Sequence, residues 1–262
     1  MSVVSTGART LLRREVLRYV RRPWNTFLPP VITNALYFVV FGVILGGRIN
    51  ATGGTPYILF ILPGLVVLGA TSDAFQNASF TIFHGRWNAY IHEVQTAPLS
   101  YVEMVGSYIS ASALRGIVIA ALVTLVGVVF TNLDPGVPPV GTAHPVYTVG
   151  FVLVITVLFA AFGVLGGLWA EDFDYLTVMN QFIIRPLVFF GAVFYPLSAL
   201  PPIWQTVSLL NPMVYMVDGL RYGFLGTADI DPTVSLVVLA VAAAVMVGVD
   251  VLLFKRGYGL TD

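Results

Sequence analysis

The sequence carries very few charges and no cysteine. Only 10% of its 262 residues are charged, 57% are hydrophobic, and the mean hydropathy is +0.87. A soluble domain is about a quarter charged, so a water-soluble protein is excluded first, and the high apolar content excludes disorder. Without cysteine there is no disulfide framework, thiol catalysis or cysteine metal site. The net charge is zero, so no global field attracts nucleic acid. These absences leave an all-α polytopic membrane protein.

Several catalytic motifs are also missing. The sole lysine, Lys255, follows Phe254 and not glycine, so the sequence has no phosphate-binding loop and cannot hydrolyse ATP by that route. The three histidines form no metal-binding motif, and no Gly-x-Ser-x-Gly nucleophile elbow is present. We therefore expect no catalytic residue, no metal site and no cofactor bound by this chain.

Six stretches are long and apolar enough to cross a bilayer. Hydrocarbon about 30 Å thick requires roughly 20 apolar residues in a helix. The predicted spans are Phe27–Leu45, Tyr57–Phe83, Val105–Phe130, Tyr147–Ala170, Tyr175–Tyr195 and Ser235–Phe254. Their continuous apolar character favours helices over barrel strands, which would alternate. Residues 1–262 thus form a single transmembrane domain.

Glycine and proline refine this picture. We expect Pro29 and Pro30 near the start of the first span, where a missing donor costs least. Gly163, Gly166 and Gly167 are predicted to allow close helix packing. The first apolar run is too long for a signal peptide, so we expect it to remain as a span.

The basic residues predict the orientation. With the N-terminus in the cytoplasm, nine basic residues lie inside, and only Arg48 and Arg221 lie outside. The nine are Arg9, Arg13, Arg14, Arg18, Arg21, Arg22, Arg86, Lys255 and Arg256. The positive-inside rule therefore places both termini in the cytoplasm.

Three segments are not spans. Residues 6–22 are predicted to form an amphipathic interfacial helix. Residues 84–104 form the longest cytoplasmic loop, in which 88–96 could make two helical turns. Residues 196–226 are apolar but cut by four prolines into pieces too short to cross. We expect this last segment to form two short helices dipping into the outer leaflet, with Asp218 and Arg221 on one face.

Three charges fall inside the predicted spans. Asp73, Arg115 and Arg185 each lie about ten residues from the inner end or start of a span, and a lone charge in the membrane normally marks a partner or a pathway. Asp73 and Arg115 are the best available pair, and we interpret them as a structural salt bridge. Arg185 lacks an obvious acid, which makes it a possible pathway residue.

Four features together resemble a known family. They are the basic N-terminal helix, the segment Glu93-Val-Gln-Thr-Ala-Pro-Leu-Ser100, the segment Leu200-Pro-Pro-Ile-Trp204, and Asn211-Pro-Met-Val-Tyr215 followed by Asp218-Gly-Leu-Arg221. In their order, within a six-span frame, they resemble the permease subunit of type-2 ATP-binding-cassette exporters. The chain is especially similar to single-domain permeases of the bacterial inner membrane that are described as multidrug exporters.

The resemblance implies partners and residue roles. Two permease copies, most simply a homodimer, would each bind a separate ATPase subunit, and ATP and Mg²⁺ would sit on that partner. The coupling loop would comprise Tyr90, Ile91, Glu93, Thr96, Ala97, Pro98 and Leu99. The outer gate would comprise Pro201, Pro202, Trp204, Asn211, Pro212, Tyr215, Asp218 and Arg221. The first, second and fifth spans would flank the dimer interface and the substrate path.

The substrate and two alternative functions stay open. Apolar spans favour an amphipathic or hydrophobic substrate, such as a drug, a lipid or a lipid-linked glycan. A secondary transporter driven by an ion gradient is one alternative, with Asp73 and Asp250 as its intramembrane acids but no inverted repeat. A membrane enzyme acting on lipids is the other, with the acidic cluster Glu171, Asp172 and Asp174 but no adjoining histidine.

Overall fold

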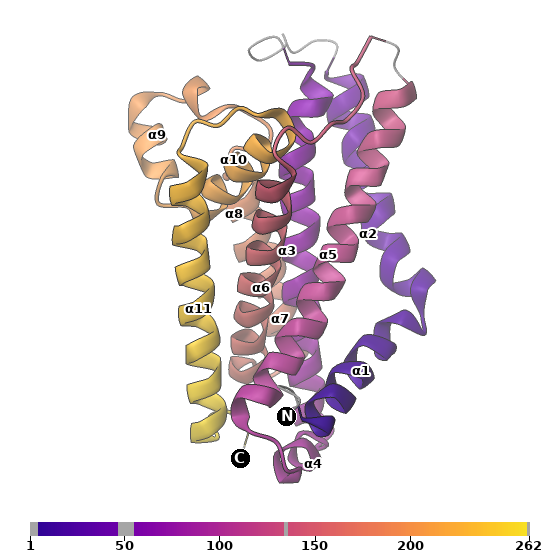
Figure 1. The fold of residues 1–262 in the computed structure, drawn as a ribbon, viewed down its shortest axis with the longest axis vertical. Helices are drawn as coiled ribbons and strands as arrows, with labels where there is room; N and C mark the ends of the chain where they lie inside the picture. The colour runs from indigo at the N-terminus through magenta and orange to yellow at the C-terminus, as the bar shows by residue number, and fades with distance from the viewer. Residues whose placement is uncertain (1–4, 47–54, 134–135, 261–262) are drawn as a thin grey trace.

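The computed structural model describes residues 5–46, 55–133 and 136–260, and every regular element in these ranges is helical (Figure 1). Arg48, which was counted on the outer side, lies outside the described residues. The helices long and apolar enough to cross a membrane number five in the described part of the chain. They are α2 (Pro23–Tyr37) with its π-helical extension η1 (Phe38–Ile44), α3 (Tyr57–Trp87), α5 (Tyr101–Leu133), α6 (Pro145–Trp169) and α11 (Pro232–Arg256). A polytopic all-α protein is confirmed.

Helix α3 is the centre of the bundle and packs mainly against α5 and α6. Its most apolar window is 94% buried, although the helix carries no amphipathic stripe. Two glycines of α6 bring it against α3: a Cβ on Gly163 would lie 2.5 Å from the carbonyl oxygen of Phe75, and one on Gly167 2.6 Å from that of Ser79. The prediction that these glycines allow close helix packing is therefore confirmed.

Helices α2 and α11 lie at the two edges of the bundle (Figure 1). In the most apolar 18-residue stretch of each helix, only 11% is buried for α2 with η1 and 17% for α11. The exposed side chains are long and apolar, among them Leu28, Ile32 and Leu36 on α2 and Val237 and Val241 on α11. Such faces are stable only against lipid or another apolar surface.

The predicted span Tyr175–Tyr195 differs most from expectation. The chain is helical from α7 (Phe173–Val178) through the π-helical η2 (Met179–Ile184) to α8 (Arg185–Phe189). It then turns at Gly191 and Ala192, and Ala192 has the unusual φ of 59°. The helical run thus ends six residues before the predicted end, because the chain reverses there toward the outer segment.

Pro29 and Pro30 also occupy an unexpected position. Helix α2 begins at Pro23, so both prolines lie inside it, not near its start. Neither can donate to the carbonyl four residues earlier, which leaves the carbonyls of Asn25 and Thr26 without that helical partner. These carbonyls add polarity to a helix that is otherwise apolar.

The two ends of the bundle carry different short helices. Helices α1 (Thr6–Val20) and α4 (Ile91–Thr96) lie at one end of the bundle, together with the C-terminal end of α11 (Figure 1). The 3-10 turn η3 (Leu197–Ala199), α9 (Pro202–Ser208) and α10 (Pro212–Leu225) belong to the segment at the other end (Figure 1). The two short helices predicted in 196–226 are thus present, and their depth in a membrane stays a prediction.

Helix α4 is shorter than predicted. Helix α3 continues to Trp87 and is capped by Asn88, and the positive φ of Ala89 turns the chain before Ile91. The predicted helix over 88–96 is therefore wrong at its start. Helix α1 begins at the Ser5 cap and buries Ala8, Leu11, Glu15 and Tyr19 on a face that packs mainly on α5.

Candidate functional site

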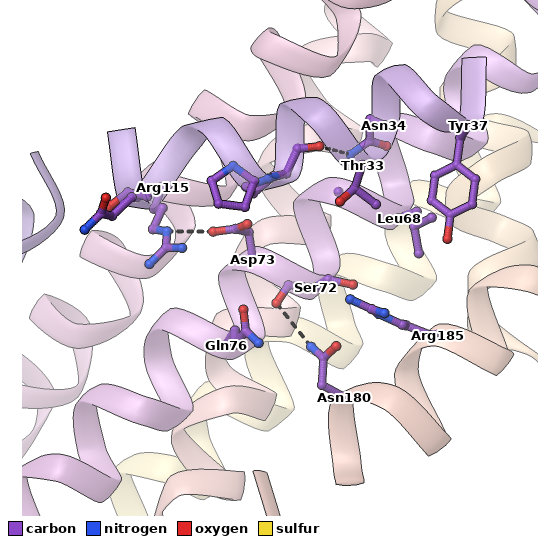
Figure 2. Close-up of a pocket in the computed structure, with 15 residues that line it drawn as sticks. Thr33, Asn34, Tyr37, Leu68, Ser72, Asp73, Gln76, Arg115, Asn180 and Arg185 are labelled. Atoms are coloured by element: carbon purple, nitrogen blue, oxygen red, sulfur yellow. Dashed lines mark hydrogen bonds and ion pairs between the residues drawn. The ribbon is translucent and has the colours of Figure 1, made fainter. Parts of the chain in front are cut away.

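A polar cavity of about 230 Å³ opens in the otherwise apolar bundle (Figure 2). Its walls come from α2, α3 and the η2–α8 segment, with Arg115 contributed by α5. It is lined by Asn25, Thr26, Pro29, Pro30, Thr33, Asn34, Tyr37, Leu68, Gly69, Ser72, Asp73, Gln76, Arg115, Asn180 and Arg185. Polar groups at membrane depth are costly unless they serve a pathway or a partner.

Asp73 and Arg115, which the sequence analysis paired, meet at the edge of this cavity (Figure 2). Arg115 Nε lies 2.6 Å from Asp73 Oδ1, and the two side chains are 18% and 7% exposed. A second donor, Arg115 Nη1, reaches Asn77 Oδ1 at 3.2 Å, and Asn77 Nδ2 donates to Ser112 Oγ at 2.9 Å. The ion pair therefore joins α3 to α5 and belongs to a larger polar cluster.

This cluster continues into α1. Arg18 donates to Asn77 Oδ1 at 3.1 Å and to the hydroxyl of Thr81. Its Nε also lies 3.3 Å from Oε2 of Glu15, which is only 3% exposed. Arg14 Nη2 lies 2.7 Å from the other Glu15 oxygen. A chain of ionic and polar contacts thus runs from α1 through Asn77 to the cavity.

Several of the predicted coupling residues line hollows together with residues of α1. Tyr90 precedes α4, and Arg14 Cζ lies over its ring, 5.8 Å from the ring centroid. Burial raises the pKa of the Tyr90 phenol. Ile91 is buried, whereas Glu93 and Thr96 face outward and the Thr96 hydroxyl donates to the Glu93 carbonyl. Two hollows of about 680 and 390 Å³ separate α1 from this loop, and Glu93 lines both.

The loop after α4 returns to the start of α1. Ala97 and Leu99 line the smaller hollow, and exposed Pro98 lies between them. A Cβ on Gly7 would lie 2.7 Å from Leu99 Cδ2, so the two segments touch. Glu103 accepts from the backbone N–H of Ser5 at 3.3 Å and of Ser100 at 2.9 Å. Helix α1 and the loop therefore form one surface.

The predicted outer-gate residues divide into exposed and anchoring ones. Pro201, Pro202 and Trp204 begin α9 and are exposed. Asn211 caps α10, and its Nδ2 donates to the Leu187 carbonyl at 2.7 Å.

Pro212 takes the first position of α10. The hydroxyl of Tyr215 donates to the Leu209 carbonyl at 2.9 Å. Together with Asn211, these two residues fix the turn between α9 and α10 and its attachment to α8.

Asp218 and Arg221 are buried on α10, with Arg221 Nη1 3.6 Å from Asp218 Oδ1. Asp218 also accepts backbone N–H bonds from Asp229 and Ile230. Arg221 donates to the Ala192 carbonyl at 2.7 Å, and its guanidinium lies 4.1 Å from the ring centroid of Phe60. The pair therefore anchors α10 to the turn after α8, to α3 and to the α10–α11 connection.

Arg185 is exposed at the side of the cavity opposite Thr33 and Asn34 (Figure 2). In the described part of the chain it forms no ion pair. Near it, Asn180 Nδ2 donates to the Ser72 carbonyl at 3.4 Å and joins η2 to α3. Across residues 5–46, 55–133 and 136–260 no cluster of histidines and acids could hold a metal ion.

Sequence reasoning missed several members of the site, most of them uncharged. Asn77 follows Asp73 by four residues, so the two share a helix face, and that spacing could have identified it. Glu15 and Arg18 were assigned to a helix facing lipid and cytoplasm, yet Glu15 is buried against α5. Asn25 and Asn180 gave a weaker signal, as amides near or within predicted spans.

Comparisons with known proteins agree with this architecture. A family model described as "ABC-2 type transporter" matches residues 6–225. The chain is 35% identical to the "Inner membrane transport permease YadH" of Escherichia coli K12, over 99% of both chains. It is 23% identical to "Nodulation protein J" of Neorhizobium galegae, over 93% of this chain and 91% of that one.

Proposed function

The chain belongs to the ABC-2 type transporter family, and on that basis we propose that it is the membrane subunit of an ATP-driven exporter of amphipathic or hydrophobic substrates in the bacterial inner membrane. A separate ATPase subunit supplies the energy and holds ATP and Mg²⁺. Two permease copies, as a homodimer, and two ATPase copies make the working unit. Both chain termini face the cytoplasm.

The observation that carries this proposal is the polar cavity between α2, α3 and the η2–α8 segment. It opens beside the weakly buried α2 and beside exposed residues of η2 and α8, including Phe182 and Leu187. A second copy of the chain covering these surfaces would enclose a path between the two cavities. In this arrangement the run from Phe173 to Phe189 serves as the sixth span, and α9 with α10 forms the re-entrant outer gate.

The surface formed by α1 and the loop around α4 receives the ATPase. Its hollows are open and charged, and its only buried anchors within α4 are Ile91 and Val94. Closure of two ATPase subunits around ATP moves this surface, and the Arg18–Asn77–Arg115 contacts carry the movement to the cavity. ATP drives the change because it binds one conformation of the complex more tightly than the other.

A charge reversal on this surface tests the coupling. Glu93→Arg should keep the permease in the membrane but lower ATP hydrolysis by the assembled complex at least tenfold, because an exposed side chain supports docking and not folding. The matched control is Asp174→Arg, a charge reversal at an exposed acid of α7 that lines neither hollow. The measurement is ATPase activity of complexes purified from membranes that express the chain with its ATPase.

Two outcomes would contradict the proposal. Full ATPase coupling in Glu93→Arg would overturn the assignment of the loop. Substrate movement by the purified chain alone, driven by an ion gradient, would instead support a secondary transporter.

A further inference from the structure

A further hollow, of about 350 Å³, lies beside the cavity and is lined by three arginines. Arg18, Arg22 and Arg115 line it together with the amide side chains of Gln76 and Asn77. None of its lining residues is acidic. We call it the arginine groove.

Helix lengths place the arginine groove at the inner boundary of the hydrocarbon. Helix α2 with η1 spans 22 residues, or about 33 Å, which matches hydrocarbon about 30 Å thick. Arg22 is the residue directly before this span. Helix α3 is longer, and counting about 20 residues from its start at Tyr57 leads to Gln76. Both helices therefore bring the groove to the level of the lipid headgroups.

The groove offers more positive charge than its partners neutralise. Arg115 pairs with Asp73, and Arg18 shares Glu15 with Arg14. The side chain of Arg22 is exposed and makes no hydrogen bond or ion pair to any described residue. A guanidinium has five N–H donors and no acceptor, so the groove presents free donors and a net positive charge. A guanidinium fork matches the oxygens of phosphate and carboxylate bidentately, and at the level of the headgroups a membrane supplies anionic lipids, whose headgroups carry phosphate.

The groove and the cavity form one continuous surface. They share the lining residues Asn25, Thr26, Gln76 and Arg115. Helix α2 turns Asn25, Thr26 and Thr33 toward the cavity, whereas Leu28, Ile32 and Leu36 are exposed on another stripe. A ligand with a polar head and an apolar tail fits this division, because its head would follow the cavity while its tail stays in lipid.

From these observations we infer that the arginine groove binds the anionic, phosphate-bearing headgroup of a membrane amphiphile and is the entry site of the transported substrate. This inference rests on the proposed function, because it names the substrate class of that path. Arg22 makes the first contact with the headgroup. Arg18 and Arg115 line the same groove and both donate to Asn77, so that headgroup binding acts on the contacts between α1 and the cavity.

Binding to the purified full-length chain in detergent tests the site without ATP or ATPase. The probes are dioctanoyl phosphatidic acid, dioctanoyl phosphatidylcholine and inorganic phosphate, titrated while tryptophan fluorescence is recorded. Arg22→Gln should weaken phosphatidic acid binding about tenfold, the effect of losing one charged hydrogen bond. The control is Arg21→Gln, the same change at the neighbouring exposed arginine. Arg21 lines the larger hollow between α1 and the loop around α4 and does not line the groove. It should change the affinity less than threefold.

Each alternative outcome overturns the inference. Equal weakening by both substitutions would mean general attraction to a basic surface. Inorganic phosphate binding as tightly as phosphatidic acid would mean a site for a soluble anion. Equal binding of phosphatidylcholine, or no binding of any probe, would mean that the groove does not select an anionic headgroup.

A second measurement separates this inference from the proposed function. In the complex with the ATPase, phosphatidic acid should stimulate ATP hydrolysis, and Arg22→Gln should need about tenfold more of it for half-maximal stimulation. If the complex hydrolyses ATP in a coupled way but phosphatidic acid neither binds nor stimulates, only the inference fails. If phosphatidic acid binds through Arg22 but no ATPase associates with the chain, the proposed function fails and the groove remains a lipid site.

Discussion

Two aspartate–arginine pairs lie in different halves of this molecule and have different surroundings. Asp73 and Arg115 come from two long helices, meet at 2.6 Å and line a cavity. Asp218 and Arg221 lie three residues apart on one helix, are separated by 3.6 Å and are almost fully buried. The Asp73–Arg115 pair, which we call the inner pair, belongs to a polar cluster that reaches α1. The Asp218–Arg221 pair, which we call the outer pair, binds backbone groups of neighbouring turns. From this comparison we expect the inner pair to respond to a movement of the helices and the outer pair to resist it.

The largest expected effect is loss of the outer arginine. Arg221→Met leaves the buried Asp218 carboxylate without its guanidinium and the Ala192 carbonyl without its donor. Breaking a buried pair in this way costs about 3–5 kcal/mol, so the melting temperature in detergent should fall by about 10 °C. Arg256→Met, at an exposed arginine in the last turn of α11, should shift it by less than about 2 °C. Equal shifts would show that α10 is not anchored by this pair.

Charge reversals in the inner pair should lower stability less than Arg221→Met does, but lower ATP hydrolysis by the assembled complex more. Asp73→Arg and Arg115→Asp each place like charges together, and the double reversal restores opposite charges. We expect the double variant to recover more ATP hydrolysis by the assembled complex than either single variant retains. Recovery should be partial, because Arg115 also donates to Asn77. Equal damage in all three variants would contradict a direct pairing.

The close contact between α3 and α6 should give an effect on stability of intermediate size. Gly163→Ala would force a methyl group to within 2.5 Å of the Phe75 carbonyl oxygen, at a cost of about 1–3 kcal/mol. Gly248→Ala on α11 is the matched control, because a Cβ there meets nothing within 4 Å. That variant should be neutral or more stable by up to about 1 kcal/mol. Thermal melting of the two proteins in the same detergent compares them, and a tolerated Gly163→Ala would mean that the helices can separate.

The smallest effect on stability is expected at the exposed face of the outer segment. The side chain of Trp204 is 59% exposed, and no residue of α9 is buried. Trp204→Ala should therefore change the free energy of unfolding by less than about 0.5 kcal/mol. A drop in melting temperature comparable with that of Arg221→Met would instead mean that another surface, such as a second copy, covers α9 in the purified protein.

The sequence predicted the long helices well because their signal is strong and local. About 20 consecutive apolar residues leave a chain in lipid little choice of secondary structure. The predictions failed where a few residues override the apolar pattern. The turn at Gly191 and Ala192 ends the fifth helical run early, and the turn at Ala89 shortens α4. Hydropathy carries no information on such backbone reversals.

Much of the candidate site was beyond sequence reasoning. Asp73 and Arg115 could be paired because charges are rare in spans and their helices are neighbours in the chain. The cavity could not be found, because it combines Thr33, Asn180 and Arg185 from helices far apart in sequence. Uncharged polar residues in a span give a weak signal individually, and only their convergence makes a polar site.

The sequence by itself determined that this chain is a helical membrane protein, because scarce charge and long apolar runs admit only that solution. It also showed that the chain has no phosphate-binding loop, because its sole lysine does not follow glycine. The tertiary structure decided which polar groups meet. It buried Glu15 between Arg14 and Arg18, joined Arg18 and Arg115 through Asn77, and left the Arg22 side chain beside them without a partner among the described residues. Polar and ionic contacts depend on distances of about 3 Å, and only the packing of separate helices sets such distances.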